Sequence, residues 1–250
     1  MAVEIFNADC LLGMKELPAR SVDMILSDLP FGSTSCRWDK KLPTAQIWAE
    51  FNRVLKDKGA CLLFAQMPFA AELVMTSPIK FRYELIWEKP LGTGFFNAGK
   101  MPLRCHEIIL VFYRHLPTYN PQFTQGEPYR KTSRNWQGEG CYNYSTPRTD
   151  GVNDDGRRCP RDVIKFASPM TTTERRYHST QKPVALLEYL IRTYTNAGEL
   201  VLDATAGSGS TAIACLNTGR NFIGYELDAQ IYSIAEERIA RALVETLNLS

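Results

Sequence analysis

The stretch DATAGSGST at residues 203–211 decides the fold, because it joins an apolar run to a helical pattern through two closely spaced glycines. Residues 199–203 are expected to form a strand, and residues 210–218 a helix. Gly207 and Gly209 allow a ligand to approach the backbone closely, and the N-terminus of the helix offers unpaired N–H groups to an anion. The stretch therefore predicts a ligand-binding turn between a strand and a helix.

An acidic residue supports this interpretation. Glu226 ends the next expected strand, at residues 221–225, and lies 23 residues after Asp203. A carboxylate at that place can accept hydrogen bonds from both ribose hydroxyls, as it does in dinucleotide-binding folds. A Gly-x-Gly pair alone is equally typical of an ordinary tight turn, and no Lys precedes Ser210 or Thr211 as a Walker loop requires. Strand, helix and spaced Glu together favour a nucleoside site.

Strands and helices alternate over much of the remaining chain. Apolar runs predict strands at residues 3–7, 22–27, 61–65, 83–87 and 108–113. Apolar residues at helical spacing predict a helix over residues 43–58 with Gly59 as its C-cap, another from Pro183 to Gly198, and a last one from Ala229 onward. This alternation predicts an α/β fold with a parallel or mixed sheet that helices cover on both faces.

Residues 114–173 show no regular periodicity and are rich in Pro, Gly, Asn, Thr and Arg, with aromatic residues interleaved. Such a length is too great for an ordinary loop in a compact domain. The segment is also basic: residues 100–182 hold 14 Lys and Arg against 8 Asp and Glu, whereas the rest of the chain holds 15 against 19. We expect it to face a polyanion. The basic residues that we expect to contact such a polyanion, nucleic acid being one candidate, are Arg130, Lys131, Arg134, Arg157 and Arg158.

Composition excludes several other classes. The 250 residues are 44% hydrophobic and 22% charged, which does not fit a disordered, collagen-like or coiled-coil chain. No apolar run approaches the roughly 20 residues of a membrane span. The seven cysteines are odd in number and irregularly spaced, without a Cys-x-x-Cys pair, and no signal peptide precedes them. We therefore expect a soluble, reduced protein of the cytoplasm, without a membrane partner.

A second motif, DLPF at residues 28–31, follows the expected strand at residues 22–27. It thus lies at the carboxyl edge of the sheet, where open α/β sheets bind ligands. On its own, Asp28 would be an ordinary turn residue and Phe31 an ordinary core residue. Together, however, DLPF resembles the Asp/Asn/Ser-Pro-Pro-Tyr/Phe motif of amino-methyltransferases, and the glycine stretch resembles their S-adenosylmethionine loop.

The order of the motifs sharpens this resemblance. DLPF precedes the glycine stretch, and HSTQKP at residues 178–183 resembles the HPTQKP segment of the beta-class DNA amino-methyltransferases, a circularly permuted group. The resemblance covers residues 3–114 and 161–239. It implies a Rossmann-like, circularly permuted methyltransferase sheet with an irregular inserted target-recognition region. The implied parts are residues 1–115 with DLPF, residues 116–173 as the target-recognition region, and residues 174–250 with HSTQKP and the cofactor loop.

The resemblance also implies the chemistry of the tetrad. The lone pair of an exocyclic base amine is delocalised into the ring, so the Asp28 carboxylate and the Leu29 carbonyl would hold its N–H groups and orient it. Pro30 shapes the turn, and Phe31 would stack on a base flipped out of the duplex. No metal or protein nucleophile is required. Leu29 stands where Pro is usual, Phe31 replaces the commoner Tyr, and Ser179 replaces Pro, and none of these departures removes an acceptor.

The cofactor would be S-adenosylmethionine. Asp9 matches the acidic residue at the cofactor adenine, Asp203 the carboxylate near the methionine amino group, and residues 180–182 the segment beside the methionine carboxylate. The implied cofactor-binding residues are Asp9, Cys10, Asp28, Thr180, Gln181, Lys182, Asp203, Ala204, Gly207, Gly209, Ser210, Thr211, Glu226 and Leu227.

A later segment of the family, near the target-base pocket, matches residues 86–90 and the pair His106 and Glu107. We expect structural roles for most of these residues. Trp87 and Phe95 are the two aromatic residues that we expect to line the pocket.

The sequence therefore predicts a DNA methyltransferase that acts on the N6 amine of adenine in a specific sequence of double-stranded DNA. Asp28 favours adenine, since Ser is commoner at this position in the cytosine-N4 enzymes. Cytosine-N4 methylation and a catalytically silent nucleic-acid-binding protein remain the alternatives, and homodimer formation stays open. A nicotinamide dehydrogenase would leave DLPF and HSTQKP unexplained.

Overall fold

The computed structural model describes residues 2–32, 40–131, 151–153, 155–169, 177 and 181–247. The chain forms two compact units, one of Met1–Asn120 with Asp162–Ser250 and the other of Pro121–Arg161. Among the described residues, no helix is both long enough and apolar enough to span a membrane.

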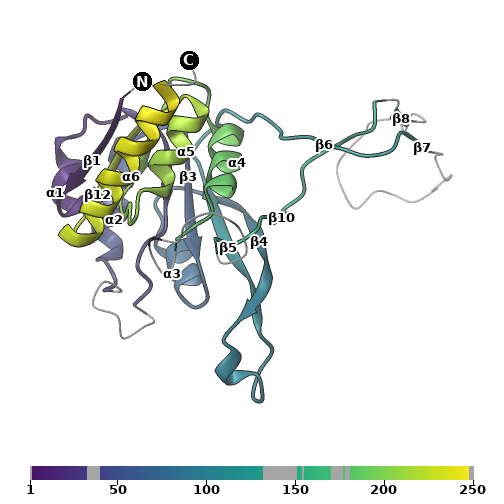
Figure 1. Ribbon diagram of the computed structural model, residues 1–250, viewed down its shortest axis with the longest axis horizontal. Coiled ribbons are helices and arrows are strands. Elements are labelled where there is room, and N and C mark those ends of the chain that lie inside the picture. The colour runs from purple at the N-terminus through teal and green to yellow at the C-terminus, as the bar shows by residue number, and fades with distance from the viewer. Residues whose placement is uncertain are drawn as a thin grey trace. The chain divides into compact units, whose positions relative to one another are not determined.

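The first unit is built on an eight-stranded mixed sheet, with the strand order β1-β12-β11-β2-β3-β5-β4-β10 (Figure 1). Its strands are β1 (Val3–Asn7), β12 (Asn221–Glu226), β11 (Leu200–Asp203), β2 (Val22–Ser27), β3 (Leu55–Ala65), β5 (Arg104–Phe112), β4 (Phe81–Thr93) and β10 (Val163–Lys165). Within this sheet only β5 runs antiparallel to its neighbours. The chain leaves β11 toward β12 on one side and β2 toward β3 on the other, so a crevice is expected at the carboxyl ends of β11 and β2.

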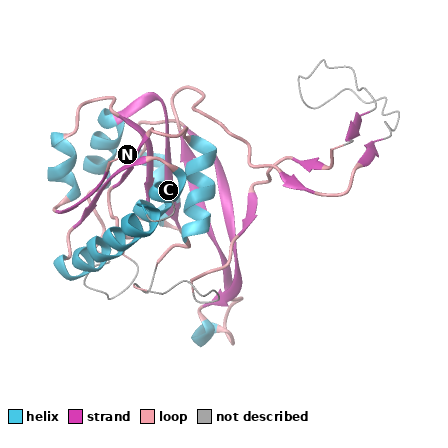
Figure 2. Cartoon of the chain, turned by 45° about the horizontal axis from the view of Figure 1, so that its top comes forward, coloured by secondary structure: helices cyan, strands magenta, loops and turns pink. Residues whose placement is uncertain are grey.

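Helices cover both faces of the sheet, as Figure 2 shows in cyan against the magenta strands. Three of them, α4 (Val184–Tyr194), α5 (Ser210–Thr218) and α6 (Ala229–Leu247), contribute to one core cluster. The others, α1 (Cys10–Gly13), α2 (Thr44–Val54) and α3 (Phe69–Thr76), contribute to a second cluster. Alternate residues of β3 enter the two clusters, Leu62 and Phe64 the first and Cys61 and Leu63 the second. The central strands are therefore buried on both faces, which explains their continuous apolar runs.

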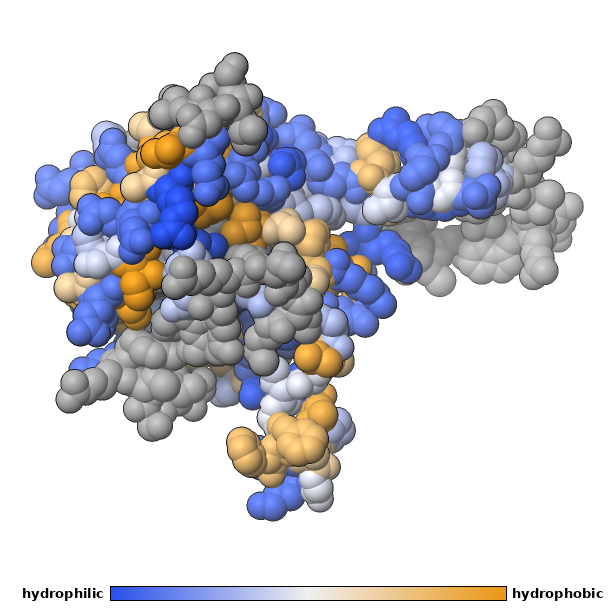
Figure 3. Space-filling view, in the orientation of Figure 1, coloured by the Kyte–Doolittle hydropathy of each residue, from blue (hydrophilic) through white to orange (hydrophobic). Residues whose placement is uncertain are grey.

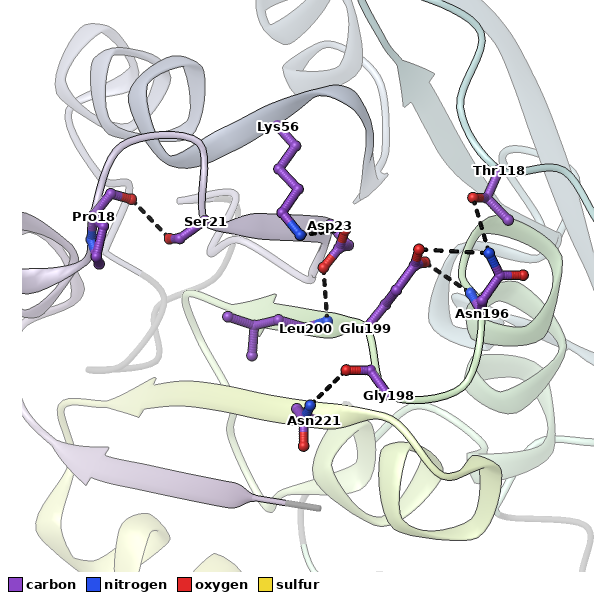
Figure 4. Close-up of polar contacts among 10 residues, drawn as sticks. All are labelled: Pro18, Ser21, Asp23, Lys56, Thr118, Asn196, Gly198, Glu199, Leu200 and Asn221. Atoms are coloured by element: carbon purple, nitrogen blue, oxygen red, sulfur yellow. Dashed lines mark hydrogen bonds and ion pairs between the residues drawn. The ribbon is translucent and has the colours of Figure 1, made fainter.

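Asp23 ties β2 to both of its neighbours at the end of the sheet opposite the crevice (Figure 4). Its Oδ1 accepts a hydrogen bond from Lys56 Nζ at 2.7 Å, and its Oδ2 accepts one from Leu200 N at 3.0 Å. β11 and β2 pair through only two residue pairs. The Asp23 carboxylate therefore adds a contact between β2, from the N-terminal part of the chain, and β11, from the C-terminal part.

The fold class predicted from the sequence is confirmed, and β1, β2 and α5 have the predicted bounds. The helix predicted over residues 43–58 is wrong in its last part, because α2 ends at Val54 and Leu55 begins β3. Gly59 is not its C-cap. A Cβ at Gly59 would lie 2.8 Å from the carbonyl oxygen of Asp23, at the irregular step where the register between β2 and β3 shifts. Strand pairing thus overrides the helical pattern, and Gly59 permits close contact between two backbones.

β4 and β5 continue beyond the sheet as a hairpin, seen below the sheet in Figure 1. Gly94 makes its turn with φ of +86°, followed by the short 3₁₀ helix η2 (Phe95–Asn97). The tip carries both apolar and hydrophilic surface (Figure 3), and Phe96 is fully exposed.

The second unit contains two short antiparallel pairs: β6 (Thr124–Gln125) with β9 (Arg157–Arg158), and β7 (Tyr129–Lys131) with β8 (Gly151–Asn153). The guanidinium of Arg157 lies 3.9 Å from the centroid of the Phe123 ring, and that of Arg158 lies 4.6 Å from the centroid of Tyr129. Elements this short leave no periodicity in the sequence.

Candidate active site

A cavity of about 1170 Å³ opens at the carboxyl ends of β11, β2 and β12. Its volume exceeds the roughly 300–1,000 Å³ of a typical pocket for one small ligand, so it has room for a cofactor and a base together. It is lined by the following predicted site residues: Asp9, Cys10, Asp28, Leu29, Pro30, Phe31, Gln181, Lys182, Asp203, Ala204, Gly207, Ser210, Thr211, Glu226 and Leu227. Gly209 is not among the lining residues.

The two glycines of the loop serve different purposes. Both have positive φ, +53° at Gly207 and +78° at Gly209. A Cβ at Gly207 would meet no atom within 4 Å, whereas one at Gly209 would lie 3.3 Å from Cβ of Ala235 in α6. Gly207 thus presents bare backbone to the cavity, while Gly209 lets α5 begin close against α6.

Two carboxylates flank this loop. Asp203 accepts hydrogen bonds from Thr211 Oγ1 at 2.7 Å and from Thr205 N at 3.1 Å, and burial raises its pKa to about 6. Glu226 accepts one from Gly207 N at 2.9 Å, and burial raises its pKa as well. Both carboxylates are held by named donors at the cavity wall, which suits them to bind cationic and hydroxyl groups.

The tetrad and the glycine loop are joined directly. Thr205 Oγ1 donates to the carbonyl oxygen of Asp28 at 3.0 Å, and Ala204 N donates to Ser27 Oγ at 2.8 Å. The ring of Phe31 lies 5.4 Å from that of Phe69, between centroids, at an interplanar angle of 38°. The backbone of the tetrad is therefore fixed relative to the loop, and Phe31 forms an aromatic part of the wall.

Four alternating charges line the cavity beside the tetrad, and we call Lys89, Glu107, Lys182 and Asp28 the charged quartet. Lys182 Nζ pairs with Asp28 Oδ2 and lies 3.3 Å from Glu107 Oε2, and Lys89 Nζ pairs with Glu107 Oε1. Asp28 Oδ1 and Glu107 Oε2 are buried and accept no hydrogen bond from any described residue. The quartet is neutral overall, and it leaves carboxylate acceptors unused at the cavity.

Burial and the neighbouring charges shift the pKa values of the quartet in different directions. Burial raises the pKa of Asp28, and the Lys182 ammonium offsets this only in part. Burial opposes the charge on Glu107 too, but Lys182 and Lys89 outweigh it and lower the Glu107 pKa. Burial also opposes the charge on Lys182, but Asp28 and Glu107 raise its pKa. Asp28 is therefore the carboxylate of the quartet that takes up a proton most readily.

Comparison with known proteins identifies the family, because residues 22–237 match the DNA methylase family. The chain belongs to this family. Curated relatives include the type II methyltransferase M.HindIII of Haemophilus influenzae, with 27% identity over 94% of each chain. Another is the DNA adenine methyltransferase YhdJ of Escherichia coli, with 26% identity over 95% of this chain and 83% of the relative.

Solved structures agree on the fold. The complex of M1.HpyAVI with S-adenosylmethionine gives a TM-score of 0.65 at 22% identity, over 95% of this chain and 98% of that one. The cytosine-N4-specific PvuII DNA methyltransferase gives 0.64 at 15% identity, over 99% and 93%. The chain is thus a DNA methyltransferase.

Several features of the methyltransferase site were not predicted. Lys89 and Glu107, in the segments that match the family near the target-base pocket, were expected to be structural, yet both line the cavity. Trp87 lines it as expected and donates from Nε1 to the carbonyl oxygen of Phe166 at 3.0 Å. Phe95, expected in the pocket, is 78% exposed on the hairpin and does not line the cavity. The sequence does not reveal that Lys89 pairs with Glu107, since the two residues lie on different strands.

The remaining predicted residues are three at the cofactor site, the candidate DNA-binding residues, and two that lie outside the described part of the chain. Asp9 caps α1, accepting from Leu11 N at 2.7 Å, and Gln181 accepts from Tyr177 N at 2.8 Å. Burial raises the pKa of the Cys10 thiol to about 12, so the thiol stays protonated. Of the candidate DNA-binding residues, Arg130 and Lys131 belong to β7, and Arg157 and Arg158 to β9. Thr180 and Arg134 lie outside the described residues.

Proposed function

We propose that this DNA methyltransferase transfers a methyl group to the exocyclic N6 amine of adenine in a specific sequence of double-stranded DNA. We further propose that it belongs to the circularly permuted beta class. One observation carries the proposal: Asp28 lines a cavity that also contains the glycine loop, and its buried Oδ1 accepts no hydrogen bond from the described residues. An amine that must be oriented by hydrogen-bond acceptors is the substrate that this arrangement suits.

The residues at the glycine loop fit the methyl donor. Gly207 leaves open space at the cavity, where the nucleoside part of the ligand can approach the backbone. We assign Asp203 to the methionine ammonium, Glu226 to the ribose hydroxyls and Asp9 to the cofactor adenine. When bound, S-adenosylmethionine supplies a methyl group that a sulfonium already activates. Gln181 lies beside the loop, with its Oε1 3.4 Å from Ser208 Oγ, and we assign it to the methionine carboxylate.

The remaining work of the site is to orient the target amine. Asp28 Oδ1 and the Leu29 carbonyl accept its two N–H groups, which turns the lone pair out of the plane of the base. Pro30 shapes the turn, and Phe31 stacks on the base after it leaves the duplex. Once methylated, the amine nitrogen sheds a proton. We assign its acceptance to Asp28 Oδ1, because burial raises the pKa of this carboxyl.

Adenine is favoured over cytosine by the identity of residue 28. The beta-class resemblance associates Ser at this position with cytosine-N4 enzymes, and here the position holds Asp. The relative YhdJ is named as an adenine methyltransferase, and this similarity extends over 95% of the chain. Cytosine-N4 methylation is the second candidate, because the PvuII enzyme that shares the fold is cytosine-N4-specific.

We propose that residues 116–173 form the target-recognition region and that Arg130, Lys131, Arg134, Arg157 and Arg158 contact DNA phosphates. The described side chains of Arg157 and Arg158 stack on aromatic rings, which orders their guanidinium groups for contact with phosphates. The site of action would be the bacterial cytoplasm, where the DNA is. Light scattering of the purified protein tests whether it also forms a homodimer.

Expression in methylation-free bacteria, followed by single-molecule sequencing of the host DNA, tests the function. We expect N6-methyladenine at one recurrent sequence, and none in cells that carry Asp28→Ala. N4-methylcytosine at a recurrent sequence would overturn the adenine assignment while keeping the enzyme class. Unmodified DNA from cells that contain folded protein would favour the catalytically silent alternative.

A further inference from the structure

We propose that Lys182 reads the target base, by donating a hydrogen bond to the ring nitrogen next to the amine that Asp28 holds. This inference rests on the proposed function, and it gives Lys182 a role at the base in place of the cofactor carboxylate.

The contacts of Lys182 place a hydrogen-bond donor beside an acceptor. Its Nζ pairs with Asp28 Oδ2, lies 3.3 Å from Glu107 Oε2, and sits 4.9 Å from the centroid of the Phe64 ring. A lysine ammonium has three N–H donors: one goes to Asp28 Oδ2, and Glu107 Oε2 forms an ion pair with the ammonium but accepts no hydrogen bond. Asp28 Oδ1, on the same carboxyl group, accepts no hydrogen bond from the described residues. Asp28 and Lys182, which both line the cavity, thus provide an acceptor and a neighbouring donor.

This pair matches the Watson–Crick edge of adenine and of cytosine. Adenine presents the N6 amine, a donor, next to N1, an acceptor, and cytosine presents N4 next to N3 in the same order. Guanine and thymine present the reverse order at the corresponding atoms, O6 with N1–H and O4 with N3–H. Flipped bases are read by hydrogen bonds to this edge, so Asp28 with Lys182 selects adenine or cytosine over guanine and thymine.

The rest of the quartet keeps Lys182 in place. Its side chain is only 10% exposed, so the ammonium needs charged partners to remain buried. Glu107 supplies a second carboxylate, and Lys89 neutralises the excess negative charge by pairing with Glu107 Oε1. With two carboxylates, Lys182 keeps an ion pair while Asp28 binds the amine. Glu107 and Lys89 are therefore positioning residues for Lys182.

A chemical double-mutant cycle tests this assignment. Wild type and Lys182→Met are compared on duplexes that carry the mapped recognition sequence, with adenine or 1-deazaadenine, in which C–H replaces N1, at the target position. In wild type the analogue should be methylated about ten- to a hundredfold more slowly, the range for a hydrogen bond to a charged group. Lys182→Met should methylate adenine more slowly than wild type by a similar factor. Within this variant, the change from adenine to 1-deazaadenine should slow methylation little further. If the change from adenine to 1-deazaadenine slowed methylation by the same factor in wild type and in Lys182→Met, the proposal would be overturned.

Two controls keep the result decisive. Wild type on 3-deazaadenine, which lacks the nitrogen on the opposite edge, should lose less than on 1-deazaadenine, and this comparison needs no variant at all. Equal losses on the two analogues would refute the reading of N1. Calorimetry should give Lys182→Met an affinity for S-adenosylmethionine within about threefold of wild type. An affinity for S-adenosylmethionine that is tenfold or more weaker in Lys182→Met would mean that Lys182 binds the cofactor, and it would overturn the proposal.

The test separates this inference from the proposed function. If sequencing maps N4-methylcytosine, the adenine assignment fails, and the same cycle is run with cytosine and 3-deazacytosine. If wild type methylates adenine but is indifferent to the loss of N1, the function stands and the reading by Lys182 fails.

Discussion

Replacing Asp203 by Asn tests whether the buried carboxylate that we assign to the cofactor lowers the stability of the folded protein. Burial raises the pKa of Asp203 from 3.8 to about 6, so the folded state binds more protons than the unfolded state between these values. The contribution of Asp203 to stability is therefore fully present below about pH 4 and is lost as the pH rises from about 4 through about 6. A shift of roughly 2 units corresponds to about 3 kcal/mol lost at pH 8. Asn keeps an acceptor for Thr205 N and can donate to Thr211 Oγ1, so the variant should recover up to this amount.

Urea unfolding of the cofactor-free protein measures the effect. We expect Asp203→Asn to be more stable than wild type at pH 8, by up to about 3 kcal/mol, and by roughly half as much at pH 5. Glu237→Gln is the matched control. Its side chain is 74% exposed and, among the described residues, pairs with Arg241 on the same helix, so its change should stay within about 0.5 kcal/mol.

The same substitution should damage the site. Without the negative charge, the affinity for S-adenosylmethionine should fall by about tenfold or more at pH 8, the scale of a lost charged contact. An Asp203→Asn protein that is no more stable than wild type at pH 8, or whose gain does not depend on pH, would refute the assignment of a destabilising buried carboxylate. Unchanged cofactor affinity would remove Asp203 from the cofactor site.

Three further outcomes follow from the same geometry. Gly207→Val should fold but lose cofactor binding by calorimetry, because its side chain would enter the open space at the cavity in a backbone conformation of φ +53°. Asp28→Ala should keep cofactor affinity but slow methyl transfer by roughly a hundredfold or more, and near-normal turnover would refute its role. Arg157→Ala/Arg158→Ala should flatten the slope of log DNA affinity against log salt by about 0.9 per lost contact, with Arg241→Ala as the control on α6. A wild-type slope in the double variant would mean that DNA is bound elsewhere.

The part of the fold that could be predicted is the part that local sequence determines. The strand ending at Asp203, the two glycines with positive φ and the helix from Ser210 are neighbours in the chain, and each carries its own signal. DLPF likewise follows directly on a strong apolar strand. These segments place the two motifs on adjacent strands, and the hydrogen bond from Thr205 to Asp28 joins residues 177 positions apart.

What could not be predicted depends on pairing between strands. The first residues of β3 have a helical pattern, and only their pairing with β2, from Leu55 opposite Val22, makes them a strand. The charged quartet depends on the hairpin register that sets Trp87 opposite Glu107, and on the segment before α4 that brings in Lys182. The register between β4 and β5 also shifts beyond Glu88. No periodicity in the sequence encodes such a shift.

The charged quartet is also a poor way to stabilise a protein, which bears on why it is there. Buried ion pairs often contribute no more stability than apolar side chains of the same size, although removing one partner alone costs about 3–5 kcal/mol. Here the pairs lie at the cavity wall, and two carboxylate oxygens accept no hydrogen bond from the described residues. A network built for stability alone would use every acceptor. Asp28 and the aromatic Phe31 line the same cavity, so the charges are better explained by a polar, planar ligand that completes them.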